Sequence, residues 1–497
     1  MAYTTVDKST TSFNSIKYTG NSSAGNITGV GLRPDWTWIK KLTDDAEDHA
    51  AFDSVRGVDT PKLLSPNAQA AVETHGNNGY VSAFISDGFT VATNGSGGDE
   101  WQYLNHSGDT FIAWNWKAGG TAPTKTYKVV VVSDSGNKYR FRNSADNATF
   151  GASAVTLDLQ EGGTYTFDVS DSTMDSHPFV IGTAANSSEY STGVTYKLDG
   201  VTKTYSQYTS GFSAATTRQL IITVADSAPA LYYWCSQHSG MGGAINTNST
   251  HGSSNFDGSI QSTVSANTSS GFSVVSYTGT GSNATVGHDL GTAPGFIMVK
   301  NRPSSSYGWY LYHQGLGNTK SLYLHTNDSV VTSSDRWNDT SPTSTVYTVG
   351  TNGGTNGSSN AMIAYCMADK PGFCKSGKYT LNNLSDNLFI NTGFKVKWLL
   401  IKNTDNVEEW YILDTTRDGL NPLQNADDSF LSANKNQSED NASGSANTVD
   451  IDLLSNGFKI RSSNTSAGEL SYGTRSYVYV AIGQSLVGSN NVPATAR

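Results

Sequence analysis

Short stretches in which apolar and polar residues alternate recur along the whole chain. Residues 36–40 (Trp-Thr-Trp-Ile-Lys) and 477–479 (Tyr-Val-Tyr) show the period of two that is expected of a half-buried strand. Asp-Gly or Asn-Gly pairs, which signal tight turns between strands, occur within residues 86–89 and 455–458. A chain of 497 residues is also too long for one hydrophobic core. The pattern therefore predicts an all-β, multidomain protein.

The strand motifs follow one another in the same order three times. Each copy begins near a Tyr-Thr pair, continues with an apolar strand that ends in lysine, and closes with an apolar, aromatic-rich strand. The strands that end in lysine are residues 34–40, 294–300 and 393–402, and the closing strands are residues 111–116, 362–366 and 477–481. Units of about 100 to 120 residues with many short strands are typical of β-sandwiches. The copies predict three related β-sandwich domains at residues 1–120, 255–370 and 371–497.

The copies differ in the strand that follows the lysine. The first copy has Phe-Asp-Ser-Val-Arg-Gly at residues 52–57, whereas the second has Tyr-His-Gln-Gly at residues 312–315. A role of Arg56 is therefore not shared by every copy, although Arg417 can keep it in the third. Two further stretches have the composition of hinges, namely residues 117–126 and 243–271.

The motif set resembles a repeat family found in structural proteins of marine tailed phages. The matching motifs are Tyr-Thr-Gly, Pro-x-Trp-x-x-Ile-Lys, Phe-Asp-Ser-Val-Arg-Gly, Ser-Asp-Gly-Phe and Trp-Asn-Trp-Lys-Ala-Gly-Gly. The resemblance covers the three repeated segments. It implies sandwiches of the SPRY-like or concanavalin-like type and a place in a virion.

Residues 127–247 do not repeat and predict a fourth domain. Apolar stretches lie next to His177 and Cys235, and His238 and Met241 follow Cys235 in steps of three residues. One thiolate, two imidazoles and one thioether form the ligand set of blue-copper sites, where Met is a distant axial ligand. The segment resembles a cupredoxin in motif order and length. The resemblance implies a Greek-key β-sandwich with a copper site formed by His177, Cys235, His238 and Met241.

Sequence alone leaves the occupancy of this site open. The same four side chains are compatible with a scaffold that holds no ion, or with one that holds zinc. The step from His238 to Met241 is shorter than in several cupredoxins, so the axial contact is also open. The three cysteines, Cys235, Cys366 and Cys374, do not form a disulfide framework. Their sparse use indicates folding in a reducing cytosol.

The charge and hydropathy of the chain indicate which kinds of partner it does not bind. The formal net charge is -10 and the pI is about 5.3, whereas a nucleic-acid binder needs a basic face. No stretch approaches the roughly 20 apolar residues that a membrane span requires. The first residues also lack the pattern of a secretory signal. We therefore expect neither nucleic-acid binding nor membrane insertion.

The motifs of several enzyme classes do not stand out in the sequence. We find no Gly-x4-Gly-Lys-Ser/Thr phosphate loop, no Gly-x-Ser-x-Gly elbow with a matching acid and base, and no His-Glu-x-x-His zinc motif. The protein is therefore predicted not to be an enzyme. Aromatic side chains on sandwich loops can stack on sugars, and the candidates, for each of which core or edge packing is the favoured interpretation, are Trp101, Tyr103, Trp309 and Trp337.

Together these features favour a virion structural protein that is assembled in the host cytoplasm. The specific prediction is an accessory tail or fibre component whose sandwiches contact host-surface glycans, since weak repeated sites gain from multivalency. A capsid decoration or head-fibre protein is one alternative. A copper-binding redox or metal-carrying protein is another. The expected partners are other virion proteins, host-surface carbohydrate and further copies of the chain.

Overall fold

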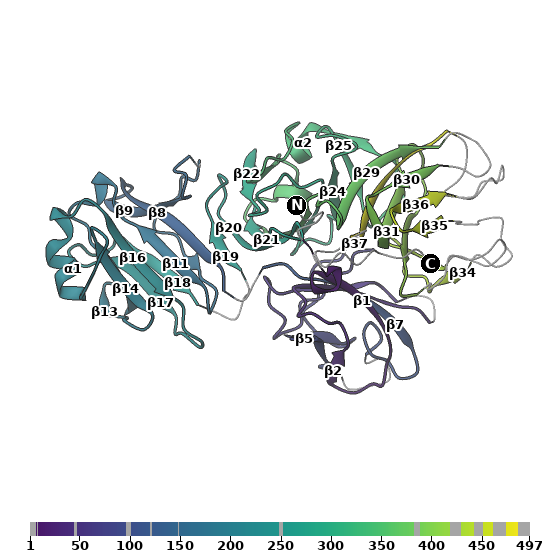
Figure 1. Cartoon of the computed structure of the whole chain (residues 1–497), viewed down its shortest axis with the longest axis horizontal. Coiled ribbons are helices and arrows are strands. Elements are labelled where there is room, and N and C mark those ends of the chain that lie inside the picture. The colour runs from purple at the N-terminus through teal and green to yellow at the C-terminus, as the bar shows by residue number, and fades with distance from the viewer. Residues whose placement is uncertain are drawn as a thin grey trace. The chain divides into compact units, whose positions relative to one another are not determined.

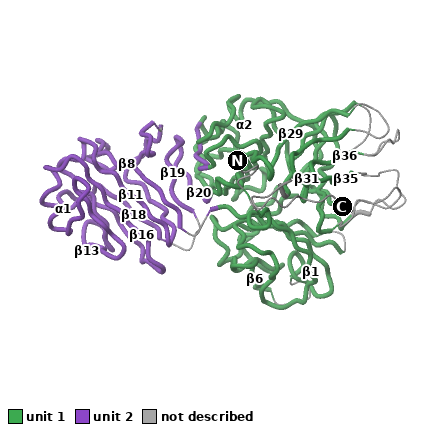
Figure 2. The backbone as a smooth tube through the Cα atoms, in the orientation of Figure 1, with its two compact units in different colours: residues 1–118, 266–283, 290–497 green, residues 119–265, 284–289 purple. Residues whose placement is uncertain are grey.

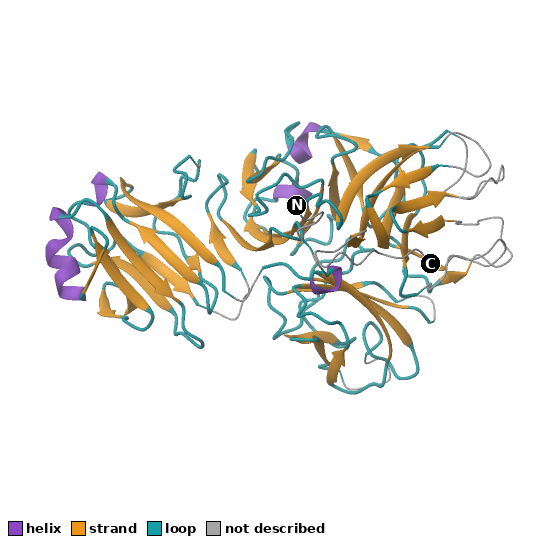
Figure 3. Cartoon of the chain, in the orientation of Figure 1, coloured by secondary structure: helices purple, strands orange, loops and turns teal. Residues whose placement is uncertain are grey.

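Most of the regular secondary structure of the chain is strand, joined by turns and loops (Figures 1 and 3). Strands account for 45% of the structure and helices for 6%, which confirms the predicted all-β, multidomain class. The computed structural model describes residues 6, 8–43, 47–95, 101–119, 122–147, 149–247, 252–381, 388–417, 429–441, 451–460 and 474–485. Within these residues, no helix is long and apolar enough to cross a membrane.

Two compact units make up the chain (Figure 2). Unit 1 comprises Met1–Ala118, Ala266–Asn283 and Leu290–Arg497, and unit 2 comprises Gly119–Ser265 and Ala284–Asp289. Unit 1 therefore holds the first and third repeated segments and most of the second, whose residues 255–265 and 284–289 belong to unit 2. We refer to them as repeat 1 (residues 1–118), repeat 2 (residues 266–283 and 290–370) and repeat 3 (residues 371–497).

Three sheets of unit 1 share one strand order. In each sheet the first strand of the repeat pairs with the last, the last with the third, and the third with the fourth, all antiparallel. In repeat 1 the strands in this order are β1 (Phe13–Thr19), β7 (Thr110–Trp116), β3 (Trp36–Lys41) and β4 (Ala50–Asp53). In repeat 2 they are β21 (Phe272–Thr278), β28 (Ala361–Met367), β23 (Phe296–Asn301) and β24 (Trp309–His313). In repeat 3 they are β29 (Cys374–Thr380), β37 (Ser476–Ser485), β31 (Phe394–Asn403) and β32 (Trp410–Asp414).

A second sheet completes a sandwich in repeats 1 and 3. Its strands are β2 (Gly25–Thr28), β6 (Gly88–Ala92) and β5 (Tyr80–Ile85) in repeat 1, and β30 (Phe389–Asn391), β36 (Gly457–Ile460) and β35 (Ile451–Leu454) in repeat 3. Phe89 and Phe111 share the core between the two sheets of repeat 1, as Phe458 and Tyr479 do in repeat 3. The remaining elements of unit 1 are η1 (Ser9–Thr11), β25 (Lys320–Tyr323), β26 (Val331–Thr332), α2 (Ser334–Trp337), β27 (Val346–Val349), α3 (Gly353–Asn356), β33 (Ser429–Ser432) and β34 (Asp440–Asn441).

The outer faces of the three main sheets meet in one shared aromatic core. Trp36 of repeat 1 stacks on Tyr365 of repeat 2, with ring centroids 4.5 Å apart. Trp116 of repeat 1 meets Trp398 of repeat 3 edge to face at 5.5 Å. Inner strands of the main sheets, such as β3, β7, β23 and β28, are therefore buried on both faces, which is why they are apolar along most of their length.

Three buried lysines join the repeats into a closed ring. Lys40, Lys300 and Lys402 stand at equivalent positions near the ends of β3, β23 and β31, and all three are fully buried. Each Nζ donates to a backbone carbonyl of another repeat: Lys40 to Asn436 (3.0 Å), Lys300 to Gln69 (3.1 Å) and Lys402 to Asn327 (3.1 Å). Repeat 1 thus binds repeat 3, repeat 3 binds repeat 2, and repeat 2 binds repeat 1. We call this arrangement the repeat ring.

A second set of contacts follows the same cycle. In each case the closing strand of one repeat reaches the end of the fourth strand of the next. The pairs are Trp114 Nε1 to Asp414 Oδ2 (3.1 Å), Tyr365 Oη to Asp53 Oδ2 (2.8 Å), and His313 Nε2 to the carbonyl of Tyr479 (3.0 Å). Asp53 and Asp414 are in turn paired with Arg56 and Arg417, whose side chains are fully buried. Arg417 therefore pairs with the aspartate that is equivalent to the partner of Arg56. In repeat 2, His313 takes the place of this aspartate at the end of the fourth strand.

His313 is expected to make the repeat ring sensitive to acid. Its Nδ1 accepts a hydrogen bond from Gly315 N at 3.0 Å while Nε2 donates to Tyr479 O, a pattern that only the neutral imidazole can make. Burial lowers the pKa of His313 to about 4. An unfolded imidazole titrates at about 6.5, so between these values the unfolded chain binds more protons than the folded one. The stability of unit 1 should therefore fall as the pH drops from about 6.5 to 4.

This expectation is tested by urea unfolding of the full chain at several pH values between 7 and 4.5. A His313→Gln variant should show a flatter loss of stability with falling pH than the parent. His75 is exposed, so a His75→Gln variant should keep the parent's slope. An unchanged slope in the His313 variant would contradict the assignment.

Unit 2 is a two-sheet sandwich with mixed pairing. One sheet has the order β10 (Leu157–Asp158), β18 (Gly243–Asn246), β17 (Leu231–Cys235), β12 (Phe179–Ala184) and β13 (Ser187–Glu189). The other has the order β15 (Val201–Lys203), β14 (Val194–Leu198), β16 (Arg218–Thr223), β11 (Thr164–Asp168), β8 (Thr124–Ser133) and β9 (Asn137–Arg142). An aromatic core, with Tyr165, Phe179 and Tyr233 among its members, lies between them. The short helices are η2 (Ser172–Met174), α1 (Tyr205–Gly211) and η3 (Phe212–Ala214).

The stretches with hinge composition contain strands. Residues 243–271 include β18, β19 (Ser253–Asn255) and β20 (Ser262–Asn267), while β22 (Ala284–Gly287) lies outside this stretch and belongs to unit 2. Ser253 and Ser254 are buried and bind Tyr165 Oη (2.6 Å) and Tyr127 Oη (2.7 Å). The boundaries between the two units, at residues 118/119 and 265/266, fall inside the two stretches of hinge composition, and the described strands of residues 243–271 are held by hydroxyl and backbone hydrogen bonds.

Candidate metal centre

The sheet register brings His177 and Cys235 to the same end of unit 2. Strands β12 and β17 are antiparallel, and Phe179 lies opposite Cys235. His177 stands two residues before Phe179, and His238 follows Cys235 by three residues. The backbone NH of Ser236 donates to Pro178 O at 3.1 Å, which holds the two segments together beyond the last strand pair. Two segments that are 58 residues apart in sequence therefore present their side chains to one point.

The donor atoms of these three residues form a compact triangle. Nδ1 of His177 lies 3.1 Å from Nδ1 of His238. The sulfur of Cys235 lies 3.9 Å from Nδ1 of His177 and 3.6 Å from Nδ1 of His238. Ligands that sit about 2.0–2.3 Å from one ion at tetrahedral or trigonal angles are separated by roughly 3–4 Å. The triangle therefore has the size that one bound ion requires.

The three candidate ligands differ in their exposure to solvent. Cys235 and His177 are buried, whereas His238 is exposed to solvent. Desolvation and the neighbouring His238 lower the pKa of His177 below its ordinary value. A lowered pKa keeps this imidazole neutral at physiological pH, which is the form that binds a metal ion.

The loop between Cys235 and β18 is held by backbone contacts that only glycine permits. A Cβ atom on Gly242 would lie 1.7 Å from the carbonyl oxygen of Tyr233, so no other residue fits there. Gly240 has a φ of +74°, and its NH donates to Asn186 Oδ1 at 3.0 Å. The glycines of the sequence Ser-Gly-Met-Gly-Gly thus let the loop turn tightly after His238.

Met241 lies in the core of unit 2 and is almost fully buried. Its carbonyl oxygen accepts a hydrogen bond from Tyr139 N at 3.0 Å. Tyr139 also donates its hydroxyl to the carbonyl of His177, again at 3.0 Å. Tyr139 therefore links the segment of His177 to the segment of Met241. The role of Met241 as an axial ligand stays a prediction.

The donor set fits copper. A trigonal arrangement of two histidines and one cysteine is the ligand geometry of blue-copper proteins, and imidazole and thiolate both suit copper. Copper would be held by Nδ1 of His177, Nδ1 of His238 and the sulfur of Cys235, and would supply a one-electron redox couple. Zinc accepts the same ligands, usually in a four-coordinate tetrahedral site, so zinc is the competing ion.

Three of the four candidate sugar-stacking residues pack in the core, which is the role that the sequence favoured. Trp101, Trp309 and Trp337 are buried in unit 1, at 5% exposure or less, and Tyr103 is partly buried. Trp309 donates its indole NH to the carbonyl of Ser65 at 2.9 Å and so joins repeats 2 and 1. These tryptophans cannot offer a ring to a carbohydrate, and core packing is the correct alternative.

Fold and site define an all-β protein with a ring of three repeats and a His-Cys-His cluster in a separate sandwich. The chain belongs to the family described as Domain of unknown function (DUF7483), which matches residues 8–140 and 202–485. The match includes Cys235, His238 and Met241, while His177 lies outside it. No curated protein matches the chain.

Proposed function

We propose that the protein is a non-enzymatic structural component of a tailed-phage virion, in an accessory tail or fibre. The observation that carries the proposal is the repeat ring, in which buried lysines, aromatic rings and aspartates join three sandwiches into one scaffold. A scaffold with this much internal burial suits a load-bearing particle protein. The motif resemblance to phage structural proteins supports the same role.

The test is the protein content of purified particles of the phage that encodes the chain. Mass spectrometry should find the protein at a fixed number of copies per particle, and an antibody against it should label the tail in electron micrographs. Label on the head would favour the capsid decoration or head-fibre alternative. Absence from washed particles would overturn the structural role.

Contact with host-surface glycans belongs to the same proposal. Binding of the purified chain to host-cell polysaccharide should be weak for one chain and strong for particles that display many chains. Particles that lack the protein should bind the same polysaccharide less well. Equal binding with and without the protein would remove glycan contact from the proposal.

A second candidate function is copper binding by unit 2. The specific observation in its favour is the triangle formed by His177 Nδ1, His238 Nδ1 and Cys235 Sγ, with edges of 3.1–3.9 Å. The purified full-length protein should retain one copper ion per chain after titration and gel filtration. Zinc added in excess should displace it only weakly, since copper(II) binds such sites more tightly. A protein that retains no copper would exclude this function.

A further inference from the structure

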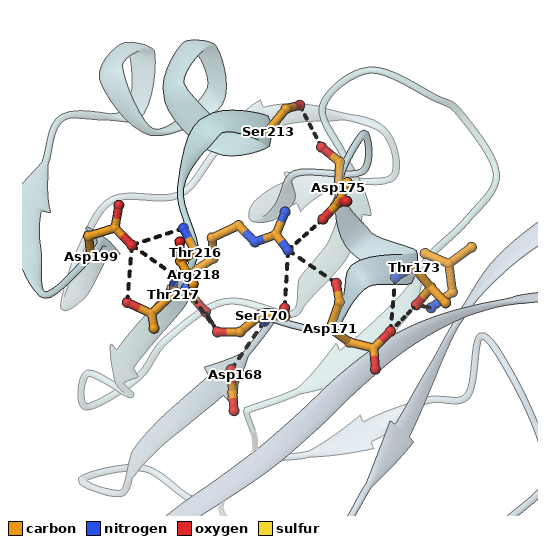
Figure 4. Close-up of polar contacts among 11 residues, drawn as sticks. Asp168, Ser170, Asp171, Thr173, Asp175, Asp199, Ser213, Thr216, Thr217 and Arg218 are labelled. Carbon is orange, nitrogen blue, oxygen red and sulfur yellow. Dashed lines mark hydrogen bonds and ion pairs between the residues drawn. The ribbon is translucent and has the colours of Figure 1, made fainter.

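The segment that carries His177 is fastened by one buried arginine. Arg218 begins β16, and its side chain is only 3% exposed. Its Nη2 atom donates to the carbonyl of Ser170 (3.1 Å), the carbonyl of Asp171 (3.2 Å) and Oδ1 of Asp175 (2.7 Å). Figure 4 shows the guanidinium group between these three residues. One side chain thus holds both ends of the loop of residues 170–175.

Further contacts make this loop a rigid piece. Asp171 Oδ1 accepts from the NH (2.9 Å) and the hydroxyl (2.7 Å) of Thr173, so it caps the short helix η2. The hydroxyl of Ser213 donates to the carbonyl of Asp175 at 2.5 Å. Arg218 itself packs on the ring of Phe212, with Cζ 4.9 Å from the centroid. The guanidinium therefore has a fixed place from which to hold the loop.

The loop is connected directly to the backbone of His177. The NH of His177 donates to the carbonyl of Met174 at 2.8 Å, and Met174 is fully buried in the core of unit 2. Only Ser176 separates Asp175 from His177. The backbone of His177 is therefore tied to the loop that Arg218 holds.

We propose that Arg218 is a positioning residue for the metal centre, which fixes the loop of residues 170–175 and through it the place of the His177 imidazole. The inference rests on the proposed copper-binding function. Arg218 does not touch the donor atoms, so it acts through the loop. Partners outside the ligand shell that orient a ligand typically change metal affinity about 10- to 100-fold when they are removed.

The test compares Arg218→Met with an Arg142→Met control in the full chain. Arg142 pairs with Asp146 on the surface of the same unit, so its loss should leave the site unchanged. We expect Arg218→Met to weaken copper(II) affinity by about 10-fold or more and to shift the visible absorption. In the metal-free protein, amide hydrogen exchange of residues 170–177 should speed up by about 10-fold or more, as expected when a local structure opens more readily.

Two further results keep the inference falsifiable. If Arg218→Met does not fold, an Asp175→Ala variant removes one of the three acceptors of Arg218 Nη2. It should change copper affinity and hydrogen exchange in the same direction, by smaller amounts. If the parent protein binds no copper, the copper function fails, while hydrogen exchange still decides whether Arg218 holds the loop. Unchanged exchange of residues 170–177 in a folded Arg218→Met variant would overturn the inference.

Discussion

A Cys235→Ser variant should lose the intense visible absorption that we expect from the copper-loaded parent. The thiolate is the ligand that gives blue-copper sites their character, and a serine hydroxyl is not deprotonated at neutral pH to replace it. Copper affinity should fall by more than about 100-fold, beyond the effect of removing a residue outside the ligand shell. The measurement is an absorption titration with copper(II) followed by metal analysis of the desalted protein.

The matched control for this variant is Cys366→Ala. Cys366 is fully buried in unit 1, burial raises the pKa of its thiol to about 12, and it is not part of the His177–Cys235–His238 cluster. The control should keep the absorption of the parent and its copper content. An absorption band that survives in Cys235→Ser, or disappears in Cys366→Ala, would place the copper elsewhere.

Replacement of Asp53 by alanine should strongly destabilise unit 1. The carboxylate of Asp53 pairs with the guanidinium of Arg56, and both side chains are fully buried. The same carboxylate accepts the hydroxyl of Tyr365 from the neighbouring repeat at 2.8 Å. Without Asp53 the charge of Arg56 stays buried and unpaired, which typically costs about 3–5 kcal/mol of folding free energy. Urea unfolding of the full chain measures the loss.

Asp59→Ala is the comparison for this variant. Asp59 also pairs with a basic residue, Lys62, but its side chain is 71% exposed. An exposed pair contributes about 0–1 kcal/mol, so the unfolding midpoint should hardly change. Equal stabilities of the Asp53 and Asp59 variants would mean that the buried pair does not support the repeat ring.

Much of the fold was predictable, because strand motifs repeat in a fixed order. The strands that end in Lys40, Lys300 and Lys402 were recognisable from their apolar run, and they take equivalent places in the three sheets. The repeat ring was not predictable, because lysine is almost never fully buried and a terminal lysine normally indicates a solvated strand end. The recurrence of lysine at this one position was the signal that could have indicated a contact between repeats.

The candidate site was predictable only as far as its ligands. The spacing of Cys235, His238 and Met241 was visible in sequence, and the structure places Cys235 and His238 beside His177. Arg218 and Tyr139 could not be identified, since each reaches the site region by the pairing of distant strands. The strands near Ser253 were missed because serine and asparagine normally indicate turns rather than buried strands.

The repeat ring has a consequence for stoichiometry. A homotrimer built from one-repeat chains carries three identical copies of every loop and insertion. In the present chain each repeat has its own sequence, and the sandwich of unit 2 follows repeat 1 alone. Where such a ring occupies a threefold position of a larger assembly, it breaks the symmetry of that position. The ring then carries one His177–Cys235–His238 cluster in place of three. If a metal ion binds there, the number of bound ions in the assembly would equal the number of rings.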